Sequence, residues 1–245
     1  MQVYTAVFDN YDRLGYRAYF SEEAGSVQHT CFSDCPIDYA RGWNVIVGEP
    51  PVKGSPKLRA KWFKVNSHIL FPDGNSLYMD GNYRLTRNPD YLDSYITKGG
   101  EDKSSDLVLF RHYRNNLKEE FEICLERPGM KRFWKDMQRQ YMVYAKDHDL
   151  ENLMLYHGSV LVRGPGAKSF NEMWWEHINK YSIRDQLSLA LVAHITKVNY
   201  SVFPGPRLDV SCIVQKALKH NSFDWAAFSR AYKSHTGKVF VKESL

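Results

Sequence analysis

The segment Ser76–Asn82 (SLYMDGN) has the clearest chemical potential in the sequence. An apolar run leads directly into Asp80, which is followed by Gly81 and by a second oxygen-bearing side chain, Asn82. Ligands of open α/β sheets gather at the carboxyl ends of strands. A carboxylate there suits a hard divalent cation, which takes oxygen ligands and bridges phosphate oxygens. Asp-Gly is also a common turn dipeptide, and on these residues alone a plain turn is the favoured interpretation.

A second candidate segment, YSIRDQ (181–186), opens an apolar helix. Ser182 and Asp185 have the spacing of a capping box, and an acid in the first helical turn also favours the macrodipole. The functional interpretation instead places Asp185 and Gln186 beside a reacting substrate atom, with Arg184 holding a carboxylate or a phosphate. The residues alone leave both interpretations open.

Three lysines share one face of a predicted helix. Ser55 can cap this helix and Pro56 suits its first position, after which apolar residues recur with helical spacing up to residue 69. On another face stand Lys57, Lys61 and Lys64. Such a row is either a solvated charged surface or a set of cations facing phosphates, and the spacing slightly favours the solvated surface.

Further candidates lie at the ends of other apolar runs. Phe110-Arg111-His112 ends one run, and Tyr156-His157-Gly158 lies within another that ends at Arg163. Lone histidines at such places are more often structural than catalytic. Trp174-Trp175 lies on a predicted helix, where core packing is expected for at least one of the two rings. Near the C-terminus, HTGK (235–238) offers a metal-binding imidazole and a phosphate-binding lysine, or is a frayed tail.

The elements that must position these residues alternate in type. Apolar runs predict strands at 3–8, 28–32, 43–47, 77–79, 107–110 and 155–162. Helices are predicted from 56 to 69, after Asn88-Pro89, from 115 to 146 with a break near Pro128-Gly129, at 168–181 and at 183–196. This alternation predicts an α/β fold with a mixed central sheet flanked by helices. We expect one domain, with a core at 1–203 and a helical C-terminal extension at 204–245, including helices near 213–218 and 225–232.

Composition limits the function classes. The chain has 245 residues, of which 43% are hydrophobic and 25% are charged. Its formal net charge of +5 should attract polyanions weakly. Its 4 cysteines form no CxxC pair, so reduced, buried thiols are expected. The sequence has no P-loop, GxSxG, HExxH or GxGxxG pattern. No apolar segment is long enough to span a membrane, and no secretory signal opens the chain, so a cytoplasmic location is expected.

Taken in order, these pieces resemble a glycosyltransferase-like family that is named after plant proteins of turgor control and mucilage synthesis and that has bacterial and viral members. The resemblance covers about residues 3–195. The segments that carry it are YTA (4–6), Tyr11-Asp12, CFSD (31–34), RAK (59–61), YMDGN (78–82), FRH (110–112), Glu119-Glu120, Gln140-Tyr141, His157-Gly158, Arg163, Trp174-Trp175 and RDQLS (184–188).

The resemblance implies a GT-A-like, Rossmann-type fold that binds a nucleotide sugar. Thr5, Ala6, Tyr11 and Asp34 would border the nucleotide, while Arg59, Lys61 and Lys238 would face its diphosphate. Asp80, Asn82 and His235 would hold a divalent cation, Mn²⁺ or Mg²⁺, although Asn82 stands where the family motif has an acid. The implied contacts of the sugar and the acceptor are His112, His157, Gly158, Arg163 and Trp174.

The resemblance also assigns the catalytic residues Arg184, Asp185 and Gln186. Asp185-Gln186 is similar to an Asp-Gln pair of retaining glycosyltransferases of the glycogenin and galactosyltransferase type. Retention of the anomeric configuration and inversion with Asp185 as base are both open. The acceptor is a glycan hydroxyl or, in a viral enzyme, a modified DNA base. The rival hypotheses are a non-catalytic module that binds a glycan or nucleotide, motivated by Asn82, and a nucleic-acid-binding protein, motivated by the positive charge.

Overall fold

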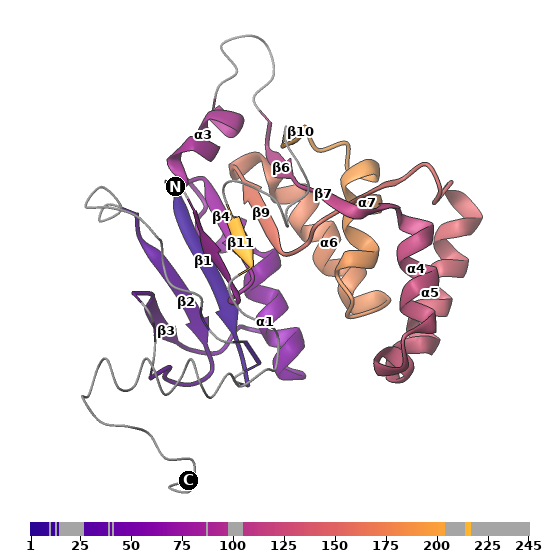
Figure 1. The fold of residues 1–245 in the computed structure, drawn as a ribbon, viewed down its shortest axis with the longest axis horizontal. Coiled ribbons are helices and arrows are strands. Elements are labelled where there is room, and N and C mark those ends of the chain that lie inside the picture. The colour runs from indigo at the N-terminus through magenta and orange to yellow at the C-terminus, as the bar shows by residue number, and fades with distance from the viewer. Residues whose placement is uncertain are drawn as a thin grey trace, which may run out of the picture.

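A seven-stranded sheet organises the part of the chain that the computed structural model describes (Figure 1). The described residues are 1–9, 11–12, 14, 27–38, 40, 42–86, 88–97, 105–203 and 214–216. The strands of the sheet are β1 (Gln2–Val7), β2 (His29–Ser33), β3 (Asn44–Val47), β4 (Ser76–Met79), β6 (Leu107–Leu109), β9 (Val160–Arg163) and β10 (Tyr200–Val202). The predicted α/β class with a mixed central sheet is confirmed.

Strand order places β1 near the centre of the sheet, and the order is β10-β6-β9-β4-β1-β2-β3. β1 pairs in parallel with β2 on one side and with β4 on the other, so that Val3 lies opposite His29 and Leu77. β9 runs antiparallel between β4 and β6. Because the chain leaves β1 first toward β2 and later returns to the other side at β4, the carboxyl ends of β1 and β4 form a topological switch point.

The core lies on both faces of this sheet. Alternate side chains of a strand point to opposite faces, and accordingly Val3 and Leu77 join one apolar cluster while Tyr4 and Tyr78 join another. All four residues of β4 and of β9 are buried. Strands covered on both faces read as continuous apolar runs, which is why the sequence pattern located them.

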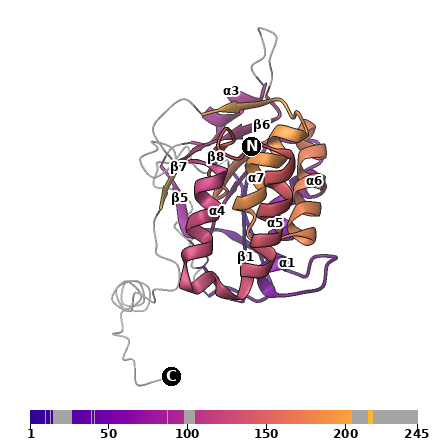
Figure 2. The ribbon, with the colours of Figure 1, turned by 90° about the vertical axis from the view of Figure 1, so that its right-hand side faces the viewer.

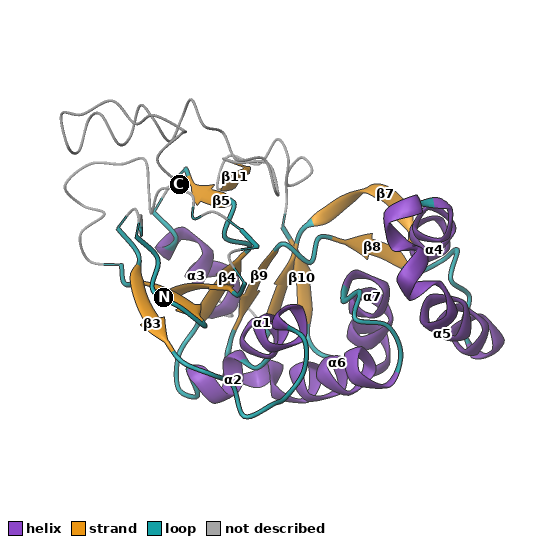
Figure 3. Cartoon of the chain, turned by 90° about the horizontal axis from the view of Figure 1, so that it is seen from below, coloured by secondary structure: helices purple, strands orange, loops and turns teal. Residues whose placement is uncertain are grey.

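Helices α1 (Pro56–Val65), α6 (Lys168–Lys180) and α7 (Gln186–Ile195) lie together on one side of the sheet, with the short α2 (Ser67–Leu70) following α1 (Figure 3). α1 begins as predicted, because the Ser55 hydroxyl accepts a hydrogen bond from Leu58 N at 3.3 Å. α3 (Asp90–Thr97) contributes Leu92 and Ile96 to the cluster on the opposite face.

A second unit, with its own apolar cluster, stands beside α7 (Figure 2). It comprises β7 (Arg111–Asn116), α4 (Leu117–Glu126), the 3-10 helix η2 (Pro128–Phe133), α5 (Trp134–Asp147) and β8 (Met154–Tyr156). β7 and β8 form a separate two-stranded antiparallel sheet. The predicted single strand at 155–162 is therefore wrong: a turn at 157–159 divides it into β8 and β9, which belong to different sheets.

Other predictions are corrected near the helix ends and the C-terminus. α7 begins at Gln186 rather than at 183, and a short 3-10 helix, η3 (Pro165–Ala167), precedes α6. The predicted helix at 213–218 is wrong at 214–216, where β11 (Val214–Lys216) pairs antiparallel with β5 (Tyr83–Leu85). The helix predicted near 225–232 lies outside the described residues. Among the helices within the described ranges, none has the length and apolar character needed to cross a membrane.

Candidate functional site

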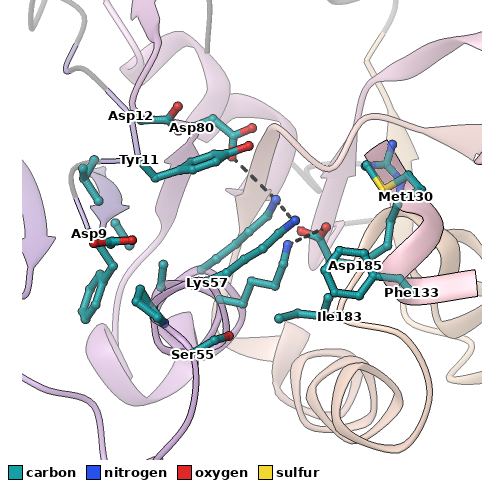
Figure 4. A pocket seen from close by; sticks show the side chains of 18 of the residues that line it. Asp9, Tyr11, Asp12, Ser55, Lys57, Asp80, Met130, Phe133, Ile183 and Asp185 are labelled. Atoms are coloured by element: carbon teal, nitrogen blue, oxygen red, sulfur yellow. Dashed lines mark ion pairs between the residues drawn. The ribbon is translucent and has the colours of Figure 1, made fainter. Parts of the chain in front are cut away.

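A cavity of about 650 Å³ opens at the switch point between β1 and β4 (Figure 4). Residues 6–9 at the end of β1 and Asp80 just after β4 form one wall. The N-terminal part of α1 and the 183–185 segment before α7 form the opposite one, and η2 contributes a third side. The location agrees with the general rule that ligands of open α/β sheets bind in the crevice outside the carboxyl ends of the strands, where strand order reverses.

At the bottom of this cavity, one carboxylate is held between two lysines of α1. Lys61 Nζ lies 2.6 Å from Asp185 Oδ1, and Lys64 Nζ lies 2.7 Å from Asp185 Oδ2. All three residues are buried. The favoured interpretation of these lysines as a solvated face is therefore wrong for Lys61 and Lys64, whose ammonium groups face inward.

The cluster also corrects the interpretation of Asp185 as a capping-box residue. Asp185 stands at the N-cap of α7, but its side chain makes no capping hydrogen bond. The Ser182 hydroxyl accepts from Arg184 N at 3.1 Å, which is a local turn rather than a helix cap. The long-range attraction of two ammonium groups outweighs the local bond, because each contact is charge-assisted in a buried setting.

Burial and charge shift the proton affinities of the cluster in different directions. Burial lowers the pKa of Lys61 to about 8, in spite of the opposing attraction of Asp185. Burial alone would raise the pKa of Asp185, but Lys61 and Lys64 together hold it well below its usual range. For Lys64, Asp185 and Asp80 outweigh burial and raise the pKa. At neutral pH the cluster is therefore two ammonium groups around one carboxylate, with a net positive charge.

Asp80 faces the same cavity from the end of β4. Its Oδ1 accepts a hydrogen bond from the Tyr78 hydroxyl at 3.0 Å and lies 3.6 Å from Lys64 Nζ. Gly81 is needed here, since a Cβ at that position would lie 2.9 Å from a methyl carbon of Val7 and 3.4 Å from the Cβ of Asp12. Asp12, which also lines the cavity, thus lies against the Asp80-Gly81 turn.

These residues fit a cation that is shared with a ligand rather than a self-contained metal site. Among the described residues, no three His, Cys, Asp or Glu side chains gather as a metal-binding group. Asn82 is fully buried and is not part of the cavity wall. Asp80, with Asp12 beside it, matches the way Mg²⁺ is commonly held, by one or two carboxylates together with substrate phosphates.

Two neighbours hold the 184–185 segment in place. The indole Nε1 of Trp174 donates to the Asp185 carbonyl at 3.1 Å. Arg184 lines the cavity and donates from Nη2 to Glu120 Oε1 at 2.8 Å. Glu120 is fully buried in α4 and also pairs with Arg114 of β7. A residue of the second unit, Glu120, thereby holds the Arg184 guanidinium group in the cavity wall.

Gln186 and Gly158 meet beneath the lysine–aspartate cluster. Gln186 Oε1 accepts from Gly158 N at 2.9 Å, and its amide nitrogen donates to the Tyr156 carbonyl. Gln186 is not among the described residues that line the cavity. A Cβ on Gly158 would lie 3.6 Å from Lys64 Nζ, so this turn forms the floor under the cluster.

Some of the residues that the resemblance assigned to the nucleotide line the cavity, and others lie outside its wall. Ala6, Tyr11 and Lys61 line the cavity, whereas Thr5 is fully buried within β1. Asp34 accepts two hydrogen bonds from the backbone N of Asp9, a residue of the cavity wall with a left-handed φ of 55°. Arg59 lies outside the wall, 3.5 Å from Asp34, and pairs with Glu49.

The predicted contacts of the sugar and the acceptor are more scattered. His112 and His157 lie against each other, with ring centroids 4.4 Å apart. Burial, and to a smaller extent repulsion by His157, lower the pKa of His112 to about 3. Arg163 is fully buried at the end of β9, opposite the first residue of β4. Its guanidinium group donates hydrogen bonds to the Val65 and Lys64 carbonyls. Trp174 is not among the described residues that line the cavity, and its indole contacts the backbone carbonyl of Asp185. His235 and Lys238 lie outside the described residues.

Sequence reasoning missed several cavity residues. They are Phe8, Asp9, Lys57, Met130, Arg132 and Phe133. Of these, Lys57 had a sequence signal, the spacing that it shares with Lys61 and with Lys64, which also lines the cavity. The η2 residues had none, because their place over the cavity depends on how the second unit packs. Lys57 Nζ lies 5.5 Å and the Arg132 guanidinium carbon 4.7 Å from the centre of the Phe133 ring.

No protein-family model matches this chain, and no curated protein matches it in sequence. One solved structure that matches is that of mouse xyloside xylosyltransferase 1 in its apo form. The match covers 82% of this chain and 84% of that chain, with a TM-score of 0.44 and 9% sequence identity. At this identity and TM-score the likeness assigns neither a family nor an activity to this chain.

Proposed function

We propose that this chain is a nucleotide-sugar-dependent glycosyltransferase of the GT-A type. The observation that carries the proposal is the position of the lysine–aspartate cluster and Asp80 in one cavity at the β1–β4 switch point. Nucleotides bind at this place in open α/β sheets, and clustered cations there suit a diphosphate.

The diphosphate site proposed here lies along α1. The start of this helix, Ser55–Lys57, lines the cavity and carries no acid in its first turn, so its partial positive charge is uncompensated by its own residues. Lys57 and Lys61 face the same space, and Arg132 faces it from η2. The aromatic rings of Tyr11 and Phe133 in the wall suit stacking on the base or the sugar.

Asp80, assisted by Asp12, would hold a divalent cation, Mn²⁺ or Mg²⁺, against the phosphates. When bound, the cation supplies positive charge that stabilises the departing diphosphate. Lys61 and Lys64 supply the same kind of stabilisation from the protein side, and they are already positioned before the reaction.

In the proposed reaction the bond between the anomeric carbon and the diphosphate oxygen breaks, and the diphosphate leaves with the electron pair. The acceptor oxygen bonds to the anomeric carbon and loses its proton. Asp185 is the group that orients the acceptor hydroxyl or takes this proton. Arg184 binds an anionic group of either substrate, and Gln186 keeps Asp185 in position through the 157–159 turn.

Thermal-shift measurements against a panel of nucleotide sugars, with and without Mn²⁺, test the proposal. A ligand that binds only the native state raises the Tm with its concentration. We expect one donor to raise the Tm of the wild type with Mn²⁺, and to have little effect on Asp80→Ala. Asp185→Ala should still bind this donor but should transfer no sugar.

Full transfer by Asp185→Ala would overturn the role given to Asp185. Absence of any donor-induced shift, in all metal conditions, would favour a non-catalytic module whose Asp80 is a turn residue. A Thr30→Ser variant, altered in the sheet away from the cavity wall, controls for loss of stability.

A further inference from the structure

Asp185 occupies the position that an anionic ligand of the two lysines would take. Its two oxygens each receive one ammonium group, Lys61 at 2.6 Å and Lys64 at 2.7 Å. Phosphate oxygens accept from the same ammonium groups with the same geometry and carry more charge. All three side chains border the cavity, so a ligand that enters it meets the pair from the open side. We refer to Lys61 and Lys64 as the lysine clamp.

We propose that Asp185 is the internal counter-ion of the lysine clamp, and that a diphosphate displaces it on binding. This inference rests on the diphosphate site of the proposed function and adds what that site does to Asp185. Without ligand, the carboxylate compensates two buried ammonium groups that would otherwise destabilise the fold. With ligand, the diphosphate takes over this compensation.

Displacement changes the chemistry of Asp185, because the two ammonium groups in contact with its oxygens then face the diphosphate instead. The charged and titratable groups that interact with it are Lys57, Lys61 and Lys64 from α1, Tyr78 from β4 and the adjacent Arg184, and Asp80 at the end of β4 shares Lys64 with it. Arg184 is already paired with Glu120. A buried carboxylate that loses its cations and faces an additional anion binds a proton more readily.

Donor binding thus turns Asp185 from a counter-ion into a base. Before binding, the clamp keeps its carboxylate too weakly basic to take a proton from a hydroxyl. After binding, one Asp185 oxygen accepts the proton of the acceptor hydroxyl as the acceptor oxygen bonds to the anomeric carbon and the diphosphate leaves. When no acceptor is bound, the same oxygen takes a proton from solvent and returns it before transfer can begin. The base therefore forms only when a leaving group is in place.

Isothermal titration calorimetry of the full chain with inorganic pyrophosphate, in two buffers of different ionisation enthalpy, measures this proton. At pH 6 Lys61 is already charged, since its pKa is about 8, so its own uptake is small. We expect the wild type to take up more protons on binding than Asp185→Asn does, by up to about one per site. Asp185→Asn should also bind pyrophosphate about tenfold more tightly, because no internal anion competes. Glu176→Gln, which removes an exposed carboxylate of α6 away from the cavity wall, should behave as the wild type.

Equal proton uptake by wild type and Asp185→Asn, with unchanged or weaker binding by the variant, overturns the inference. If Asp185→Asn does not fold, the double variant K61M/D185N replaces it in the comparison, since it removes one charge of each sign. Proton uptake by this double variant equal to that of the wild type also overturns the inference. The expected pyrophosphate pattern without turnover of any nucleotide sugar supports the counter-ion role and overturns the transferase. Turnover with equal proton uptake overturns only the counter-ion role.

Discussion

The indole nitrogen of Trp174 donates a hydrogen bond to the backbone carbonyl of Asp185 at 3.1 Å. A fully buried aromatic residue of α6 thereby holds the backbone of Asp185, the N-cap residue of α7, whose side chain enters the cavity. Sequence alone suggested that one tryptophan of the pair packs in the core. The structure adds that the packing residue also sets the position of the central carboxylate.

Trp174→Phe should lower the free energy of unfolding by about 1–3 kcal/mol, because a buried hydrogen bond and part of the ring volume are lost together. Urea denaturation measures this difference. Trp175→Phe on the same helix is the control, since Trp175 is only partly buried. Equal stability of Trp174→Phe and the wild type would show that the hydrogen bond from the indole nitrogen does not stabilise the fold.

Lys61 gives two opposite pH trends. In the folded chain the pKa of Lys61 is about 8, which is lower than the pKa of a lysine in the unfolded chain. Above about pH 8 the unfolded chain therefore binds more protons than the folded chain, and the free energy of unfolding rises with pH. Affinity for pyrophosphate should fall over the same range, as the ammonium group becomes neutral. Binding and thermal melts between pH 7 and pH 10 would be compared with Lys61→Met, in which both trends should disappear. Affinity that is flat from pH 7 to pH 10 in the wild type contradicts a direct contact of Lys61 with the anion.

Gly81→Ala should destabilise the protein by about 1–3 kcal/mol, since the new methyl group meets a buried Val7 side chain in the neighbouring strand. The strain falls on the turn that carries Asp80, so donor binding should weaken with stability. Gly74→Ala is a matched control, because its Cβ would have no atom within 4 Å. Chemical denaturation of both variants measures the two free energies of unfolding. An equally mild loss of stability at the two positions would contradict the close contact between residue 81 and Val7.

Glu120→Gln should be among the most damaging single changes outside the cavity. It leaves Arg114 and Arg184 without their shared carboxylate in a buried site, a loss on the order of 3–5 kcal/mol. Glu122→Gln, at an exposed position of the same helix, provides the comparison. Measured unfolding free energies within about 1 kcal/mol of each other would rule out a structural role for this network.

Local patterns located the sheet but not the contacts across it. The apolar runs of β1 and β4 predicted both strands, and the polar residue at the end of β4, Asp80, pointed to the cavity. The pairing of Lys61 with Asp185 was not predictable, because the two residues are far apart in the chain and meet only when α1 and α7 pack on the same face. The local spacing of Ser182 and Asp185 even offered a different partner, a helix cap that the structure does not contain. The roles of Arg132 and Phe133 depend in the same way on the packing of the second unit.

The amide of Gln186 spans the joint between the two sheets, since it holds the turn that divides β8 from β9. The same residue begins α7, directly after Asp185. One side chain therefore ties the two-stranded sheet of β7 and β8 and the turn before β9 to the start of α7, directly after the residue whose carboxylate enters the cavity.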